Sequence, residues 1–202
     1  MAKMKRKGKP FVRHAESRGS AVRIYTDGSC LRNPAGPGGW AFVVALDPGT
    51  TGRSGHDPCT TNNRMEIMGV LEAMKYARTH HYGLPVDIYT DSEYVRCACE
   101  QWLDGWKRRG WKRAEGELLN KDLWQEVYEA RSLVNARFLR VPGHSGHALN
   151  ELADQYAGEA ARGNCVDTVG GATNLRLAKI VIYDESDPEP MSSFHEDVLV
   201  GV

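Results

Sequence analysis

The fold is decided by residues 21–28, AVRIYTDG, in which small or apolar side chains alternate with polar ones as far as Asp27. This alternation predicts a β-strand that runs into a turn at Asp27-Gly28. A second alternating stretch, VDIYT at residues 86–90, runs into Asp91 in the same way. If the two strands lie side by side and parallel, their carboxyl ends bring both aspartates to one edge of a sheet. Open α/β sheets place their functional sites at that edge.

The stretches on either side complete the pattern of an α/β domain. The apolar run at residues 40–46 is typical of a strand buried on both faces, and a weaker strand is expected within residues 52–59. Periodic apolar positions and capping residues predict a last strand at 137–141 and helices at 61–78, 92–103, 120–134 and 149–161. The order of these elements predicts an α/β fold with a mixed sheet, antiparallel at its start and parallel afterwards.

The charges divide the chain of 202 residues into three zones, although its formal net charge is zero. Residues 1–20 hold seven cations and one anion, residues 21–163 are nearly neutral, and residues 164–202 hold two cations and seven anions. We expect a disordered basic arm, one domain at 21–163 and an acidic C-terminal extension. The arm is either a tether that binds nucleic acid or a leader without a role. The extension is either solvated or docks residues 180–183 on the domain as an extra strand.

The composition excludes several classes of protein. With 41% hydrophobic and 8% aromatic side chains, the chain is neither disordered throughout nor collagen-like. It has no apolar run of about 18 residues, and no apolar segment follows the basic N-terminus as it would in a secretory signal. The five cysteines show neither a CxxC pair nor zinc-like spacing. We therefore expect a cytoplasmic protein that is a monomer and makes no membrane contact.

Four carboxylates are candidates for a metal site. Asp27 and Asp91 end predicted strands, Glu66 lies near the start of the helix at 61–78, and Asp154 lies early in the last helix. Oxygen ligands without cysteine or paired histidine favour Mg²⁺ or Mn²⁺ over zinc. Two such ions can activate a water and stabilise the leaving oxygen of a phosphodiester. For any one of the aspartates alone, an ordinary role in a turn is the alternative.

The motifs around these carboxylates resemble those of type 1 ribonuclease H, the bacterial-type ribonuclease HI, in the same order over about residues 22–162. They are YTDGSC (25–30), TTNNRME (60–66), TDS (90–92), WKRRGWK (106–112), NKDLW (120–124) and VPGHSGH (141–147). The resemblance implies the ribonuclease H-like fold, a five-stranded mixed sheet with helices on both faces. It also implies an endoribonuclease that cleaves the RNA strand of RNA/DNA hybrids and leaves 5′-phosphate and 3′-hydroxyl ends.

The resemblance also implies the catalytic residues. Four carboxylates would bind two Mg²⁺ ions, with Mn²⁺ as a substitute: Asp27, Glu66, Asp91 and Asp154. His144 would act in proton transfer or product departure from a loop flanked by glycines, and the alternative is a surface histidine without a function. Two other functions stay open, a hybrid-binding module without catalysis and another nuclease of the same superfamily.

Contacts to the hybrid are implied by the same resemblance. Interleaved cations and indoles between Trp102 and Arg113 form a basic protrusion that can neutralise phosphates and pack against sugars or bases. The alternatives are a solvated charged helix with tryptophans in the core and, at residues 61–63, ordinary helix capping. Glu93 stands where many relatives carry glutamine, which replaces an amide donor by a carboxylate. The implied contacts are Gly28, Asn33, Thr61, Asn62, Asn63, Glu93, Tyr94, Trp102, Trp106, Lys107, Arg108, Arg109, Trp111, Lys112 and Asn120.

Overall fold

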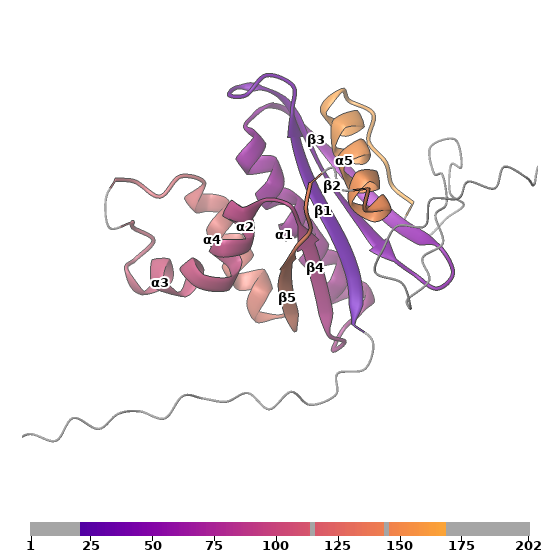
Figure 1. Ribbon diagram of the computed structural model, residues 1–202. Coiled ribbons are helices and arrows are strands. Elements are labelled where there is room, and N and C mark those ends of the chain that lie inside the picture. Colours follow the sequence, from indigo (N-terminus) through magenta and orange to yellow (C-terminus); the bar gives the residue numbers. More distant parts are fainter. Residues whose placement is uncertain (1–20, 114–115, 144–145, 169–202) are drawn as a thin grey trace, which may run out of the picture.

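The computed structural model describes residues 21–113, 116–143 and 146–168 (Figure 1). The expected arm at 1–20, His144 and the candidate strand at 180–183 lie outside these residues. The described chain forms one five-stranded sheet in the order β3-β2-β1-β4-β5. The strands are β1 (Val22–Cys30), β2 (Gly36–Ala45), β3 (Thr50–Thr60), β4 (Val86–Thr90) and β5 (Ala136–Arg140).

The sheet is mixed, as the element order predicts. β1 pairs antiparallel with β2, and β2 pairs antiparallel with β3. On its other side β1 pairs parallel with β4, and β4 pairs parallel with β5. The two strands that carry or precede Asp27 and Asp91 are therefore neighbours in the middle of the sheet.

Helices cover both faces of the sheet (Figure 1). Successive side chains of a strand point to opposite faces. Ile24 of β1 accordingly packs in the larger core cluster with side chains of the first helices, whereas Tyr25 packs in a second cluster with α5. The helical segments are α1 (Asn62–His80), α2 (Glu93–Cys97), the π-helical turn η1 (Ala98–Trp102), α3 (Leu103–Arg108), α4 (Lys121–Ser132) and α5 (Ala148–Ala161).

Two local expectations are wrong. β1 does not turn at Asp27 but continues to Cys30, because residues 28–30 pair with residues 38–40 of β2. The glycine that predicts a turn instead allows a close backbone approach, a common role of glycine inside a strand. The single helix expected at 92–103 is divided into α2, η1 and α3 and extends to Arg108.

The start of α1 follows from its capping residue. Thr61 has extended backbone angles, and its side-chain oxygen accepts a hydrogen bond from the Arg64 amide at 3.3 Å. This bond satisfies one of the free amides of the first turn. The expected cap at residues 61–63 is therefore confirmed at Thr61, and it fixes where Glu66 stands on the helix.

Residues 166–168, here called the edge segment, lie along the free side of β3. The Ser54 amide donates to the Val166 carbonyl at 2.8 Å, and the Thr168 amide donates to the Gly52 carbonyl at 2.9 Å. Arg53 and Asp167 form an ion pair at 3.1 Å between these two bonds. The first residues after 163 therefore pack on the domain.

No helix in the described part of the chain is long and apolar enough to cross a membrane.

Candidate functional site

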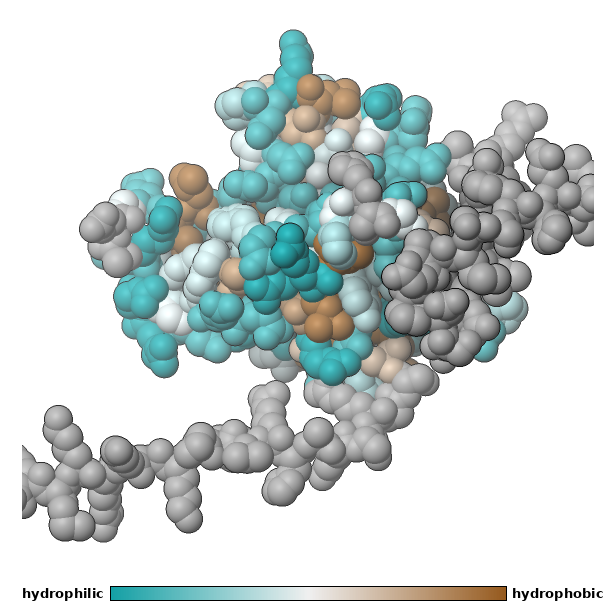
Figure 2. Space-filling model, in the orientation of Figure 1, coloured by the Kyte–Doolittle hydropathy of each residue, from teal (hydrophilic) through white to brown (hydrophobic). Residues whose placement is uncertain are grey.

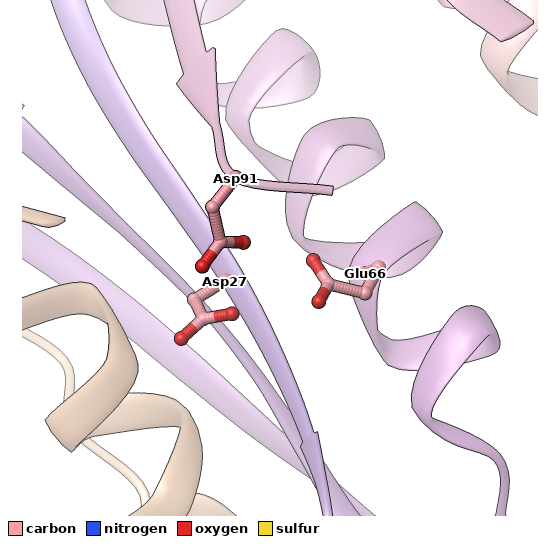
Figure 3. Close-up of side chains that lie close together, drawn as sticks. All are labelled: Asp27, Glu66 and Asp91. Atoms are coloured by element: carbon pink, nitrogen blue, oxygen red, sulfur yellow. The ribbon is translucent and has the colours of Figure 1, made fainter. Parts of the chain in front are cut away.

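Three carboxylates from separate elements meet at the carboxyl end of β4, where this strand lies beside β1. Asp27 belongs to β1, Asp91 follows β4, and Glu66 points toward both from α1 (Figure 3). One carboxylate oxygen of each residue lies within 4.8 Å of those of the other two. The parallel pairing of β1 and β4 thus brings the two aspartates together, and α1 adds the third acid.

Glycines allow the helix to lie close enough for this meeting. A Cβ atom on Gly28 would fall 2.1 Å from the backbone nitrogen of Glu66, and one on Gly69 would fall 3.0 Å from the Asp27 carbonyl oxygen. Both distances are too short for a larger residue unless the backbone moves. α1 therefore crosses β1 in backbone contact, which places Glu66 beside Asp27.

Burial and mutual repulsion make these carboxylates hard to ionise. Burial, together with the charges of Asp91 and Asp154, raises the pKa of Asp27 to about 8, although the Gly28 amide donates to its Oδ1 at 2.7 Å. Burial raises the pKa of Glu66 well above its usual value, and the charges of Asp27 and Asp91 act in the same direction. A cation bound between them would offset this cost.

Glu66 also supplies a test of whether a metal fits. Its Oε1 accepts a hydrogen bond from Asn62 Nδ2 at 3.5 Å, but its Oε2 is buried and has no hydrogen-bond partner among the described residues. A buried acceptor without a donor is costly, and a cation removes that cost. The clustered oxygens and the absence of cysteine or histidine from the cluster suit Mg²⁺ or Mn²⁺.

Asp154 stands at the margin of this cluster. It is exposed on α5 and does not belong to the three acids whose oxygens lie within 4.8 Å. Its charge and a side-chain hydrogen bond nevertheless raise the pKa of Asp27, so the two carboxylates are close. α5 holds it there because the adjacent Ala153 is buried against Tyr25 and Ala41 of the sheet.

The loop that carries His144 begins directly over Asp91. A Cβ atom on Gly143 would fall 2.7 Å from Asp91 Oδ2, so a larger residue there would displace this carboxylate. On the far side of the loop Gly146 has φ of +80°, a backbone conformation that favours glycine. His144 itself lies outside the described residues. Gly143, the residue before it, lies against Asp91 of the acidic cluster.

Arg64 connects two groups of expected contacts and is a residue that sequence reasoning missed. Its guanidinium donates to Asn120 Oδ1 at 3.5 Å and binds Asp122 through two bonds of 3.1 and 2.7 Å. Its amide binds Thr61, so the N-termini of α1 and α4 are joined. The signal available in the sequence was its place three residues after the capping threonine.

The asparagines expected to contact the hybrid lie next to the acidic cluster. Asn33 Oδ1 accepts a hydrogen bond from the Asn62 amide at 3.2 Å, which joins the loop after β1 to the start of α1. Asn62 in turn contacts Glu66, whereas Asn63 is exposed. Asn62 and Gly28 therefore contact carboxylates of the cluster directly, and Asn33 is joined to it through Asn62.

The tryptophans of the basic protrusion differ in exposure. Trp102 is 38% exposed, whereas Trp106 and Trp111 are only 7% and 9% exposed. For the last two, the alternative of tryptophans in the core describes what the structure shows. The rings of Trp106 and Tyr94 both contact the ring of Trp102, with centroid distances of 5.8 Å and 6.2 Å respectively.

The cations of the protrusion are exposed, but two of them contact neighbouring groups: Arg109 Nε donates to the Lys112 carbonyl at 3.3 Å, and Lys107 contacts rings and an acid. Lys107 Nζ lies 5.7 Å from the Trp111 ring centroid and 5.0 Å from that of Tyr128, and 3.5 Å from Glu129 Oε1. Arg108, Arg109 and Lys112 are also exposed. Figure 2 shows mostly hydrophilic residues over the side of the molecule that holds α3. Lys107 thus holds the protrusion against α4, while its neighbours face solvent.

Glu93 does not present a free negative charge. Arg96 binds its carboxylate through Nε at 3.0 Å and Nη2 at 2.6 Å. This pairing, with a hydrogen bond from Cys97 Sγ, lowers the pKa of Glu93 to about 2. The repulsion expected from a carboxylate at this position is therefore balanced by a neighbour on the same helix turn.

Comparison with known proteins gives concordant matches. The family model for RNase H matches residues 19–162. A ribonuclease H of Thermus thermophilus is 43% identical over 143 residues, which cover 70% of this chain and 84% of that protein. The ribonuclease H of Nitratidesulfovibrio vulgaris is 47% identical over 138 residues, which cover 67% and 86% of the two chains. The crystal structure of LC9-RNase H1, a type 1 RNase H with the type 2 active-site motif, is 34% identical, with a TM-score of 0.64 over 74% of this chain and 78% of that one.

Proposed function

The chain belongs to the ribonuclease H family, and from this membership we propose that it hydrolyses the RNA strand of RNA/DNA hybrids, leaving 5′-phosphate and 3′-hydroxyl ends. The observation that carries the proposal is the meeting of Asp27, Glu66 and Asp91, in which the buried Oε2 of Glu66 has no donor within the described ranges. A protein that only binds hybrids has no need for three clustered acids, since each costs free energy to bury.

The four carboxylates would hold two Mg²⁺ or Mn²⁺ ions. When bound, such a pair supplies an activated water and stabilises the leaving oxygen in an in-line displacement. Asp27 would hold the ions together with the other three acids, since Asp91 and Asp154 act on its carboxylate and Asp27 acts on that of Glu66. Asp91 would orient the attacking water. His144 would move a proton as the product departs, which suits a side chain that titrates near neutral pH.

The surroundings would hold the two strands differently. The exposed Trp102 and the cations Arg108, Arg109 and Lys112 would hold the DNA strand on the protrusion, and Thr61 and Asn120 would bind one of its phosphates. Asn33, Asn62, Asn63 and the Gly28 backbone would contact the minor groove. A groove with 2′-hydroxyls on one strand only distinguishes a hybrid from duplex DNA. The proposal includes a monomer that acts in the cytoplasm.

Cleavage of a labelled hybrid in Mg²⁺ tests the proposal. The parent should cut the RNA strand and leave duplex DNA intact, whereas Asp27→Asn and Asp91→Asn should bind the hybrid but cut it at least a hundredfold more slowly, a loss of about 2.7 kcal/mol in transition-state stabilisation. Arg78→Gln, an exposed change in the last turn of α1, is the control and should cut like the parent. A parent that binds the hybrid without cutting it would make the chain a binding module.

A further inference from the structure

Arg140 stands at the same edge of the sheet as the acidic cluster. It is the last residue of β5, and its register partner on β4 is Thr90, the residue before Asp91. Its side chain is exposed. Because side chains two residues apart share a face, Arg140 leaves the strand on the side of Phe138, which is buried in the larger core cluster. Arg140 therefore faces the side of the sheet covered by α2.

The chain after Arg140 leads directly to the carboxylates. The Val141 amide donates to the Thr90 carbonyl at 3.2 Å, and the Gly143 backbone then passes against Asp91 Oδ2. Arg140 is thus at the base of the loop that carries His144. It therefore stands beside the position that a phosphate bound at Asp91 would take.

Arg140 is also the cation that its surroundings leave available. Its charge acts on Glu93, but the Glu93 carboxylate is already bound through both oxygens by Arg96. Within the ranges that the structure describes, the Arg140 guanidinium has no hydrogen bond or ion pair. Arg137, three residues earlier on the same strand, is by contrast paired with Asp87. Glu93, Arg96 and Arg140 together carry one net positive charge beside the metal site.

We propose that Arg140 binds a phosphate of the RNA strand next to the phosphate that is cleaved. This inference rests on the proposed function, since it takes the cleaved strand to be RNA. A guanidinium presents two parallel N–H donors that match phosphate oxygens, and an exposed guanidinium outside any ion pair of the described chain gives up little to bind them. The contact is separate from the protrusion, whose cations lie on and after α3. Arg96 takes part by binding both oxygens of Glu93, so that this carboxylate does not pair with Arg140.

The test compares Arg140→Gln with Arg78→Gln, which removes the same charge at the far end of α1. Arg140→Gln should raise the KM for a hybrid about tenfold at low salt and lower the slope of log KM against log salt by about one, with kcat within twofold of the parent. Arg140→Lys should recover part of the affinity, and Arg78→Gln should match the parent. Equal KM values and salt slopes for Arg140→Gln and Arg78→Gln would overturn the proposal.

Neutral linkages identify the strand. A hybrid with one methylphosphonate in the RNA strand beside the cleavage site should bind the parent more weakly than the unmodified hybrid does, whereas Arg140→Gln should bind the two hybrids equally. The same interference from the DNA strand alone would overturn the strand assignment. The affinities for these hybrids are measured in Mg²⁺ with Asp91→Asn added to each protein, so that binding is followed without cleavage. Cleavage by the parent is measured separately. If the parent cuts no hybrid, the proposed function fails whatever Arg140 does, whereas a cutting parent with an indifferent Arg140 overturns only this inference.

Discussion

The backbone nitrogen of Glu66 lies where a side chain on Gly28 would have to be, 2.1 Å from the position of its Cβ atom. The neighbouring carbonyl carbon of Met65 lies 2.4 Å from the same position. β1 and α1 therefore touch through their backbones where the strand carries Asp27 and the helix carries Glu66. This contact is what lets acids from a strand and a helix share one small site.

Gly28→Ala should therefore damage both stability and activity. Since the obstacle is backbone, α1 has to move, and we expect a loss of about 1–3 kcal/mol in the free energy of unfolding. The cleavage rate should fall as well, because Glu66 moves away from Asp27. Urea unfolding and hybrid cleavage measure the two effects.

Gly158→Ala is the matched control for that change. Its Cβ atom would meet only Arg162 Nη1, at 3.5 Å, and alanine favours a helix over glycine by up to about 1 kcal/mol. This variant should be slightly more stable than the parent and equally active. A Gly28→Ala protein as stable as Gly158→Ala would contradict the close backbone contact between β1 and α1.

The metal-free protein should lose stability as the pH rises from about 4 to 8. The pKa of Asp27 is raised to about 8 in the folded chain, so the folded chain keeps a proton that the unfolded chain releases above about pH 4. Each retained proton contributes a slope of up to about 1.4 kcal/mol per pH unit. The raised pKa of Glu66 acts in the same direction. Urea unfolding at several pH values in EDTA measures the slope.

Asp27→Asn isolates the contribution of this carboxyl, since asparagine does not titrate. The variant should lose stability less steeply than the parent over the same pH range. Mg²⁺ at pH 8 should raise the Tm of the parent more than that of the variant, because a ligand that binds only the folded chain stabilises it. Identical pH profiles for parent and variant would contradict the raised pKa.

Lys107→Gln should reduce stability, whereas Arg108→Gln at the adjacent position should reduce hybrid binding. Lys107 contacts the rings of Trp111 and Tyr128, so its loss should cost about 0.5–1 kcal/mol of stability and alter tryptophan fluorescence. Arg108 is exposed, and its loss should weaken hybrid binding and reduce the salt slope by about one without changing stability. If Lys107→Gln alone lowered the affinity, the separation of roles between the two cations would be wrong.

Shortening the chain should show what the edge segment contributes. A chain that ends at residue 168 keeps the edge segment and is the control. One that ends at 163 should lose about 2–3 kcal/mol, since it gives up the backbone hydrogen bonds to Gly52 and Ser54 and the ion pair of Arg53. It should also self-associate, because the edge of β3 becomes free to pair with another chain. Light scattering of the two truncated chains at equal concentration checks the second effect.

Local patterns in the chain were sufficient for the architecture. Alternation at residues 21–26 and 86–90 predicted the two parallel strands, Thr61 predicted the start of α1, and the order of elements predicted the mixed sheet. These features depend on side-chain periodicity and on hydrogen bonds within a few residues, and both can be predicted from the local sequence. The aspartates at the ends of both alternating stretches also pointed to the site.

Burial, pairing and charge at the site came only from the packing of distant segments. No local pattern shows that pairing with β2 extends β1 beyond Asp27, or that Arg64 joins α1 to α4. Nor does any local pattern show that Trp106 and Trp111 are buried while Trp102 is exposed. The same holds for the raised pKa of Asp27 and for the Arg140 guanidinium, left without a partner among the described residues. The physical reason is that solvation and electrostatic energy depend on every group nearby in space, and here those groups come from elements far apart in the sequence.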